Sequence, residues 1–196
     1  MLSRNKIGLT FSLLCLLFVA VPATAVAQTW TTLRPAGEGF SLQLPLEPKA
    51  ESSNVPILGD DYLMKMYTAV DDPNRMLYMA VMQEFPAVVA SLKPAQRLDQ
   101  FMNGFRNGFV KALTTSCPDV DLKLDTELTI KGRMGRQYSL DCKGVHGLIR
   151  VIENERRMYV LLVMGGDERN AGVGHFFDSF EILPAPVPVP KPVASN

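Results

Sequence analysis

Four consecutive segments in the C-terminal half of this 196-residue chain have the apolar patterns of β-strands. A tight turn joins the first segment to the second, and another joins the third to the fourth. The first segment places alternate residues on one face: Val120, Leu122, Leu124, Thr126, Leu128 and Ile130. A period of two residues is typical of a half-buried strand. Lys131-Gly132 and Asn154-Glu155 supply the turns of two hairpins. Because strands joined by tight turns pair antiparallel, this half of the chain predicts an antiparallel sheet.

The N-terminal half adds further strand-like segments. Phe40, Leu42 and Leu44 alternate with polar residues, as in a half-buried strand. Residues 62–70 and 76–85 are rich in apolar and aromatic residues, and the turn sequence Asp-Asp-Pro-Asn-Arg lies between them. These two segments therefore predict another hairpin. Residues 46–61 are mainly polar, and we expect at most a weak strand there.

Between the two strand-rich halves, the apolar period changes to three and four residues. The apolar stripe consists of Leu98, Phe101, Met102, Phe105, Phe109 and Leu113. It predicts an amphipathic helix of about five turns that begins at Pro94. Gly104 and Gly108 lie next to this stripe, and we expect them to let the helix sit close on the sheet. A short helix near Phe176 is expected after the last long strand, so the fold class is α+β, an antiparallel sheet flanked by helices.

The first residues have the three parts of a secretory signal. Arg4 and Lys6 precede an uncharged apolar run, and Ala25 and Ala27 occupy the small positions of a cleavage site. The run is short for a membrane span, which needs roughly 20 residues. We therefore expect a signal peptide at 1–27 and export to the periplasm or the exterior, with no membrane span in the mature chain. An uncleaved membrane anchor is the alternative.

Composition suggests how the rest of the chain is organised. Residues 28–183 have the length and apolar content of a single α+β domain. Residues 184–196 alternate proline with small residues, which is typical of a disordered tail. Two of the 20 basic residues and none of the 20 acidic ones lie in 1–27, which leaves 18 against 20. This balance provides no general attraction for nucleic acid, so we expect an unknown protein or envelope component as the partner.

Cys117 and Cys142 are the only cysteines outside the predicted signal peptide. In an exported chain, such a pair favours a structural disulfide over a redox or metal site, with free or separately paired thiols as the alternative. The turn at Lys131-Gly132 would place Cys142 opposite about Leu122. We therefore expect the chain to bend back at Pro118-Asp119, so that the disulfide ties the helix exit to the end of a strand.

Methionine is the one unusual component of the composition. Soft thioethers select Cu(I), so a set of methionines on two paired segments is a candidate metal site. The set is Met64, Met66, Met76, Met79 and Met82. Methionine also packs well in sheet cores, which is the simpler interpretation. Asp119, Asp121 and Asp125 alternate as on a solvated strand face, and a curled Ca²⁺ loop is the disfavoured alternative.

His175, Asp178 and Ser179 have the residue types of a hydrolase triad within one short predicted helix. A triad needs its serine and histidine within hydrogen-bond reach and beside an oxyanion site, and neighbours on a helix surface seldom meet in this way. No Gly-x-Ser-x-Gly elbow is present. We therefore expect no catalytic residues, no cofactor and no enzyme activity, and a hydrolase remains the weakest hypothesis.

The C-terminal third follows a pattern that recurs in exported bacterial proteins. It contains a Gly-Arg pair, an arginine-bearing strand, Arg-x-Tyr before an apolar strand ending in glycine, and a phenylalanine-rich end. The matching residues are Gly135, Arg136, Tyr138, Arg150, Arg157, Tyr159, Gly165, Phe177, Ser179 and Phe180. Residues 40–48 are similar to the opening strand of the same proteins. By these motifs the chain resembles the PsbP-like family.

The resemblance implies an α/β/α sandwich built around an antiparallel sheet. It also implies a protein that binds or helps to assemble larger complexes and is not an enzyme. It carries over no catalytic residue, and the fold alone does not determine the function. The sequence therefore predicts an exported, non-enzymatic binding or accessory protein, with a Cu(I) binder as the alternative.

Overall fold

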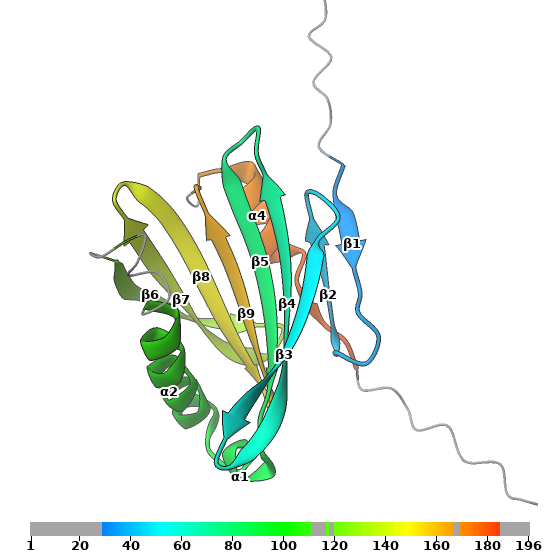
Figure 1. The fold of residues 1–196 in the computed structure, drawn as a ribbon, viewed down its shortest axis with the longest axis vertical. Coiled ribbons are helices and arrows are strands. Elements are labelled where there is room, and N and C mark those ends of the chain that lie inside the picture. Colours follow the sequence, from blue (N-terminus) through cyan, green and yellow to red (C-terminus); the bar gives the residue numbers. More distant parts are fainter. Residues whose placement is uncertain (1–28, 111–116, 118–119, 167–168, 185–196) are drawn as a thin grey trace, which may run out of the picture.

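A seven-stranded antiparallel sheet forms the centre of the fold (Figure 1). The computed structural model describes residues 29–110, 117, 120–166 and 169–184. In spatial order the strands are β3 (Lys49–Ile57), β4 (Asp60–Asp71), β5 (Met76–Glu84), β9 (Arg157–Met164), β8 (Val145–Asn154), β7 (Arg133–Cys142) and β6 (Asp121–Ile130). The predicted hairpins are confirmed, because β4 pairs with β5, β6 with β7 and β8 with β9.

One face of this sheet is covered by a small sheet and a helix. The small sheet consists of β1 (Thr31–Leu33), β2 (Phe40–Leu44) and β10 (Glu181–Ile182), and the helix is α4 (Ala171–Asp178). The core on this side includes Phe40, Leu42, Tyr67, Ala69, Met76, Tyr78, Ala80, Met82, Phe176 and Phe180. Alternate residues of β4 and β5 therefore point into it, as the period of two requires.

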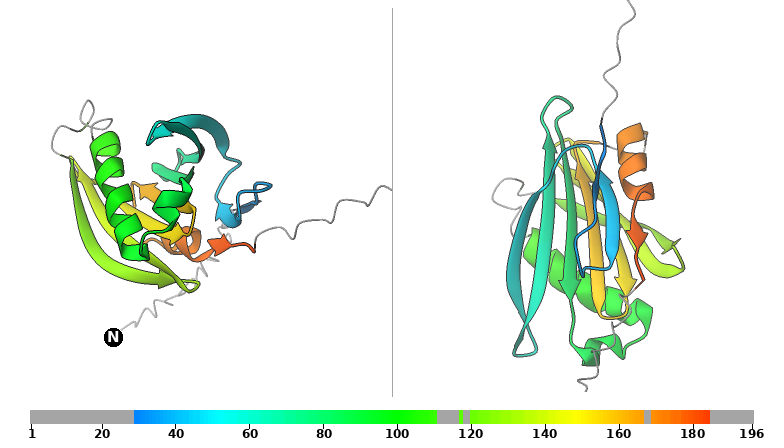
Figure 2. Two further views of the ribbon diagram at one scale, coloured as in Figure 1. Left: turned by 90° about the horizontal axis from the view of Figure 1, so that it is seen from below. Right: turned by 90° about the vertical axis from the view of Figure 1, so that its right-hand side faces the viewer.

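Helix α2 (Pro94–Phe105) lies on the other face and packs on β7 and β8 (Figure 2). Its apolar stripe joins a second core that includes Leu98, Met102, Tyr138, Leu140, Ile149, Val151 and Leu162. A short helix, α1 (Ala87–Ala90), precedes α2, and a π-helical turn, η1 (Arg106–Val110), follows it. With helices on both faces of an antiparallel sheet, the predicted α+β class and the α/β/α arrangement are confirmed.

The predicted long helix begins at Pro94 as expected, but its two glycines do not have the predicted role. Regular α-helix ends at Phe105 and the π-helical turn continues it, while residues 111–113 lie outside the described part of the chain. A Cβ atom added at Gly104 or Gly108 would meet no atom within 4 Å, so these glycines do not bring the helix close to the sheet. They lie on the exposed side of the helix.

The sequence predicts that alternate residues from Val120 to Ile130 share one face of a strand, and this prediction is wrong beyond Leu124. The β6–β7 register shifts there, because Leu124 pairs with Tyr138 whereas Thr126 pairs with Gln137. One extra residue in one strand is a β-bulge, and it interrupts the alternation between the faces. β6 is an edge strand, and Leu122 is its only buried residue.

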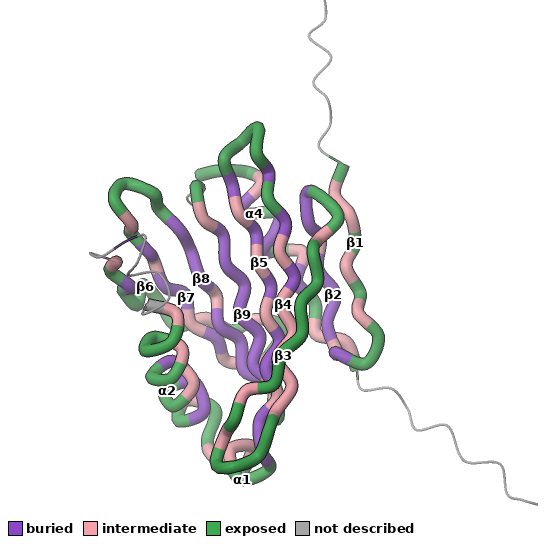
Figure 3. Tube along the Cα trace, in the orientation of Figure 1, coloured by how far each residue is buried: buried purple, intermediate pink, exposed green. Residues whose placement is uncertain are grey.

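Strand β3 is better formed than the sequence indicates. Its nine residues pair along their full length with β4, although most of them are exposed (Figure 3). Pro56 is tolerated near its end because β3 is an edge strand, and an edge strand leaves half of its backbone groups unpaired in the sheet.

Cys117 and Cys142 form a disulfide with 5.6 Å between their Cα atoms, as the sequence predicts. The bulge moves the strand register, because Leu122 pairs with Leu140 and not with Cys142. Continuing this register places Cys142 opposite Val120, whose backbone N–H donates to the Cys117 carbonyl at 3.3 Å. This hydrogen bond lies beside the disulfide, and the predicted bend at Pro118-Asp119 falls outside the described residues.

The predicted signal peptide, and the proline-rich tail from residue 185 onward, lie outside the part of the chain that the structure describes. Within that part, each helix is too short or too polar to cross a lipid bilayer.

Candidate binding surface on the open half of the sheet

Helix α2 covers only part of its face of the sheet. Over β4 and β5, apolar side chains on this face remain half-buried or exposed, and of these Leu77, Met79 and Val81 pack against the edge of the core beneath α2. We call this surface the open face, and its residues are Met64, Met66, Thr68 and Val70 of β4 with Leu77, Met79 and Val81 of β5. Val70, near the end of β4, is 52% exposed.

The strand register explains why these residues share one face. Met66 pairs with Val81, and Thr68 pairs with Met79. Residues directly opposite each other in an antiparallel ladder point to the same side. Their sequence neighbours Tyr67 and Ala80 point into the core beneath β2 and α4. The open face is therefore a continuous surface that runs across two neighbouring strands.

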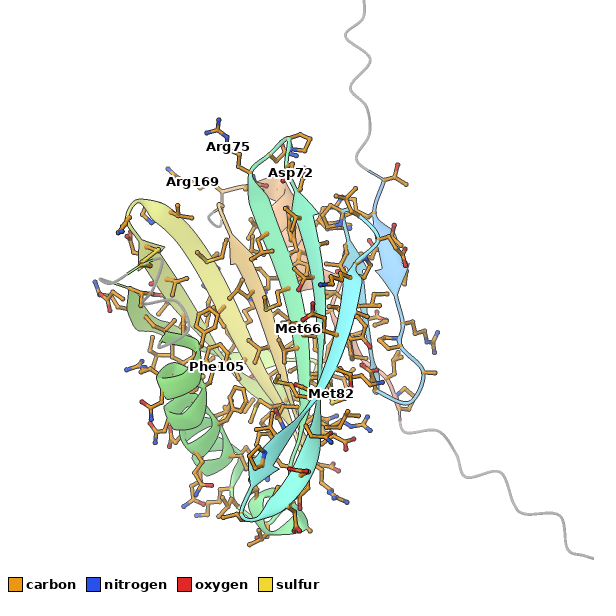
Figure 4. All side chains as sticks on the ribbon, in the orientation of Figure 1. Met66, Asp72, Arg75, Met82, Phe105 and Arg169 are labelled. Carbon is orange, nitrogen blue, oxygen red and sulfur yellow. A yellow bond between two sulfur atoms is a disulfide. The ribbon has the colours of Figure 1, made fainter. Side chains whose placement is uncertain are left out.

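A row of phenylalanines forms the wall of the open face on the helix side. Phe101, Phe105 and Phe109 stack along α2 and η1, with ring centroids 5.6 and 4.8 Å apart. Phe85 meets the ring of Phe101 edge-on. All three stacked rings are only half-buried, and Figure 4 labels Phe105 on α2 and Met66 on β4.

Charged residues border the apolar surface on the β3 side, and others lie beyond α2. On β3, Lys49 lies opposite Thr68 and Glu51 lies opposite Met66 in the strand ladder. The Lys49 ammonium and the Glu51 carboxylate form an exposed ion pair at 2.6 Å. This ion pair raises the pKa of Lys49. On the far side of α2, Arg136 of β7 binds Asp99 at 2.6 Å, and this contact raises the pKa of Arg136. The surface thus has an apolar centre and a charged border.

The structure divides the five predicted methionines between two faces. Met64, Met66 and Met79 lie on the open face, whereas Met76 and Met82 are buried in the opposite core. The Met76 sulfur accepts weak hydrogen bonds from Tyr78 and Asn170, at 3.4 and 3.6 Å. The five thioethers are therefore not brought together in one place.

The remaining acidic candidates are spread along the edge strand. Asp121 binds Lys123 at 3.1 Å, and Asp125 accepts a hydrogen bond from Ser139 at 2.8 Å. Asp119 lies outside the described residues. Among the described residues, no three His, Cys, Asp or Glu side chains are grouped so that they could hold a metal ion.

The three residues of the hydrolase hypothesis are bound to other groups. The His175 ring lies 4.2 Å from that of Trp30, and its Nε2 is 2.6 Å from Gln43 Oε1. Ser179 donates its hydroxyl hydrogen to the Phe176 carbonyl at 2.8 Å and accepts one from the Gln43 backbone. Asp178 faces Arg150 at 3.8 Å. The serine and histidine thus help to attach α4 to β2.

A hollow, which the sequence did not indicate, lies at one end of the sheet. It has a volume of about 280 Å³ and is lined by Arg75, Gly144, Val145, His146, Gly165 and Gly166. Three separate turns meet there, so no sequence motif could reveal it. His146 is held by Asp141 at 2.9 Å, and the described residues that line the hollow include no serine, threonine or cysteine.

A buried carboxylate also has no signal in the sequence. Glu38 is 3% exposed, and its Oε1 accepts hydrogen bonds from Lys65 at 2.6 Å and from Tyr67 at 2.7 Å. Burial and then the contact with Glu38 raise the pKa of Tyr67. Tyr159 donates its hydroxyl hydrogen to the Glu38 carbonyl at 2.9 Å. These contacts attach the β1–β2 turn to the large sheet.

The fold is similar to that of a solved protein, although the sequence itself matches no family model and no curated protein. The solution structure of cyanobacterial PsbP (CyanoP) from Synechocystis sp. PCC 6803 is similar, with 14% sequence identity and a TM-score of 0.47. The match covers 81% of this chain and 95% of that protein. In structure, as in sequence pattern, the chain resembles a PsbP protein.

Proposed function

We propose that this chain is an exported, non-enzymatic binding or accessory protein, and that the open face is where it holds a protein partner. The observation that carries the proposal is the group of apolar side chains on β4 and β5 that stay half-buried or exposed beside α2, where Leu77, Met79 and Val81 are only partly packed against the second core. A folded chain ordinarily keeps such a group under a helix or under another sheet, because burial of apolar surface stabilises the fold.

The composition of the surface supports a protein as the partner. Protein interfaces are enriched in methionine and aromatic residues at their centre and have a polar border. Here Met66 and Met79 lie at the centre with Phe105 beside them, and the Lys49–Glu51 pair forms part of the border. Methionine side chains are flexible and adapt to irregular partner surfaces.

Two features support export. Residues 1–27 have the pattern of a secretory signal. The disulfide between Cys117 and Cys142 suits an oxidising compartment, because cytosolic thiols are kept reduced. Export in turn supports an envelope or exported protein as the partner.

Photo-crosslinking in intact cells tests the proposal. A benzophenone amino acid is introduced at Met79 on the open face or, as the matched control, at Leu124, which is 50% exposed on the edge strand β6. We expect Met79, and not Leu124, to form a defined adduct with an exported or envelope protein. The adduct should disappear when Val81→Lys places a charge beside the probe. Equal adducts from both positions, or none from Met79, would contradict the proposal.

A further inference from the structure

Strand β3 is an edge of the large sheet, and among the described residues no other strand pairs with its outer side (Figure 1). It pairs with β4 without a bulge, from Lys49 opposite Thr68 to Ile57 opposite Asp60. Figure 3 shows that most of its length is exposed. The outer side of β3 therefore presents a row of backbone N–H and C=O groups, and such an edge is a template for another strand.

The turn between β3 and β4 determines which backbone groups point outward. Leu58 and Gly59 have positive φ angles of 55° and 93°, as in the two-residue turn of a hairpin. Ile57 and Asp60 flank this turn and are therefore a hydrogen-bonded pair, and such pairs alternate with non-hydrogen-bonded pairs along the ladder. The residues whose backbone groups point away from β4 are then Ala50, Ser52, Asn54 and Pro56.

The opposite edge of the sheet has two protections that the centre of β3 lacks. β6 contains the bulge after Leu124, and charged side chains follow it along its length: Asp121, Lys123, Asp125 and Glu127. Bulges and edge charges are ways in which natural sheets prevent strand addition. On β3 the charged residues, Lys49 and Glu51, lie at one end, and Pro56 lies near the other. The segment between them keeps its outward N–H groups.

We propose that β3 is a dimerisation edge, where a second copy of this chain adds its own β3 antiparallel with Ser53 on the two-fold axis. Two-fold dimers are the commonest assemblies of soluble proteins, and in them each copy offers the same surface to the other. In this register Ser52 lies opposite Asn54 of the second copy, and Ala50 lies opposite its Pro56. The new ladder contains about six backbone hydrogen bonds, because the Pro56 carbonyl accepts although its nitrogen cannot donate.

The side chains of β3 are compatible with this register. On the side of the open face, Lys49 lies opposite Ile57 of the second copy and Glu51 lies opposite its Val55, so no charged residue meets another. An axis at Ser52 instead would place the two Glu51 carboxylates at diagonal positions, within reach of each other. On the other side the facing residues are small or polar and exposed, namely Ala50, Ser52, Asn54 and Pro56.

The inference goes beyond the proposed function, because it needs only a second copy of the chain. Since β3 lies next to β4, the dimer joins the open faces of the two copies into one surface. Its test uses the purified protein alone. A monomeric result would leave the cross-link from Met79 unaffected, and absence of that cross-link would leave the dimer unaffected.

Single cysteines in protein purified from the periplasm of an expression host test the register. Opposed residues of a non-hydrogen-bonded pair have Cα atoms roughly 4.5 Å apart, within the range of about 4.4–6.8 Å that a disulfide needs. We therefore expect Ser53→Cys to give a disulfide-linked dimer on mild oxidation with diamide. Ser52→Cys should give far less, because the two Ser52 positions are diagonal. Thr129→Cys, exposed on the edge strand β6, is the matched control and should give none.

Sedimentation velocity over a series of concentrations tests the assembly without an added cysteine. We expect the mass of the parent protein to rise from that of one chain to that of two. Ser53→Glu places two like charges opposite each other at an exposed position, so it should weaken dimerisation by roughly tenfold or more, whereas Thr129→Glu should leave it unchanged.

Three results would each overturn the inference. The first is the mass of a single chain at every concentration. The second is a yield of cross-linked dimer from Ser53→Cys no higher than that from Ser52→Cys or Thr129→Cys. The third is a Ser53→Cys adduct with a co-purified protein in place of the dimer, which would show that a foreign strand occupies the edge.

Discussion

Arg97 of α2 and Glu153 of β8 form an ion pair buried between the helix and the sheet, with side chains that are 8% and 4% exposed. The Arg97 Nε donates to Glu153 Oε2 at 3.0 Å, and another nitrogen of the guanidinium donates to the Ala90 carbonyl at 2.9 Å. The pair fixes the start of α2 over β8. By holding the helix on this half of the sheet, it leaves β4 and β5 uncovered.

Removing one member of this pair should destabilise the fold strongly. Arg97→Met leaves the Glu153 carboxylate buried without its partner, and such changes cost about 3–5 kcal/mol. The double variant Arg97→Met with Glu153→Leu should recover much of that loss, because it leaves no unpaired charge. Urea unfolding of the two variants and the parent protein provides the measurement. If the double variant is as unstable as the single one, the pair does not act as described.

Two methionines of one strand provide a matched comparison of the two faces. Met82 is 1% exposed, so Met82→Ala should reduce the free energy of unfolding by about 2–5 kcal/mol through the cavity that it leaves. Met79→Ala on the open face should cost less than half as much, because that side chain is already in contact with water. Chemical denaturation measures both, and equal losses would show that the face is covered in solution.

The hairpins and their turns could be predicted from the sequence because they depend on local signals. Lys131 and Gly132 both have positive φ angles, 50° and 78°, which suits the tight turn expected there. The bulge after Leu124 could not be predicted, because an extra residue in a strand of uniformly alternating polarity leaves no mark on the pattern. Strand β3 escaped notice because an exposed edge strand needs few apolar residues.

The disulfide should contribute to stability chiefly by restricting the unfolded chain. The two cysteines are 25 residues apart. Removal of a disulfide that closes a loop of this size typically lowers the free energy of unfolding by about 2–4 kcal/mol. Cys117→Ser with Cys142→Ser should therefore lower the urea midpoint, and dithiothreitol should lower the midpoint of the parent protein to the same value. No effect of the reductant on the parent protein would mean that the bond is not formed.

Stability should fall at alkaline pH through two buried tyrosines. Burial and then the charge of Asp71 raise the pKa of Tyr78 to about 12, and burial followed by the contact with Glu38 also raises that of Tyr67. In the unfolded chain tyrosine ionises near pH 10. Because the folded-state pKa is the higher one, the stabilisation is complete below about pH 10 and is lost as the pH rises toward 12.

Urea midpoints measured in steps from pH 8 to pH 11 test this expectation. The parent protein should lose stability above about pH 10 more steeply than Tyr78→Phe, which has one ionisable group fewer. Parallel curves for the two proteins would show that Tyr78 is not shielded from ionisation by the fold.

The candidate surface was only partly visible in the sequence. The alternation of strand residues already separates Met64 and Met66 from the side chains next to them, and it separates Met79 from Met76 and Met82. The sequence does not show which face is left uncovered. That depends on where α2 lies across the sheet, which is set by contacts distant in the chain such as Arg97 with Glu153.

The accessibility of the open face is the central claim, and methyl NMR of protein labelled with ¹³C at the methionine ε-carbons tests it most directly. A soluble nitroxide broadens the signals of methyl groups that solvent can reach. The account predicts strong broadening for Met64, Met66 and Met79, and little for Met76 and Met82, whose assignments come from single Met→Leu variants. Equal protection of all five methyl groups would contradict it, because the open face would then be covered in the free protein.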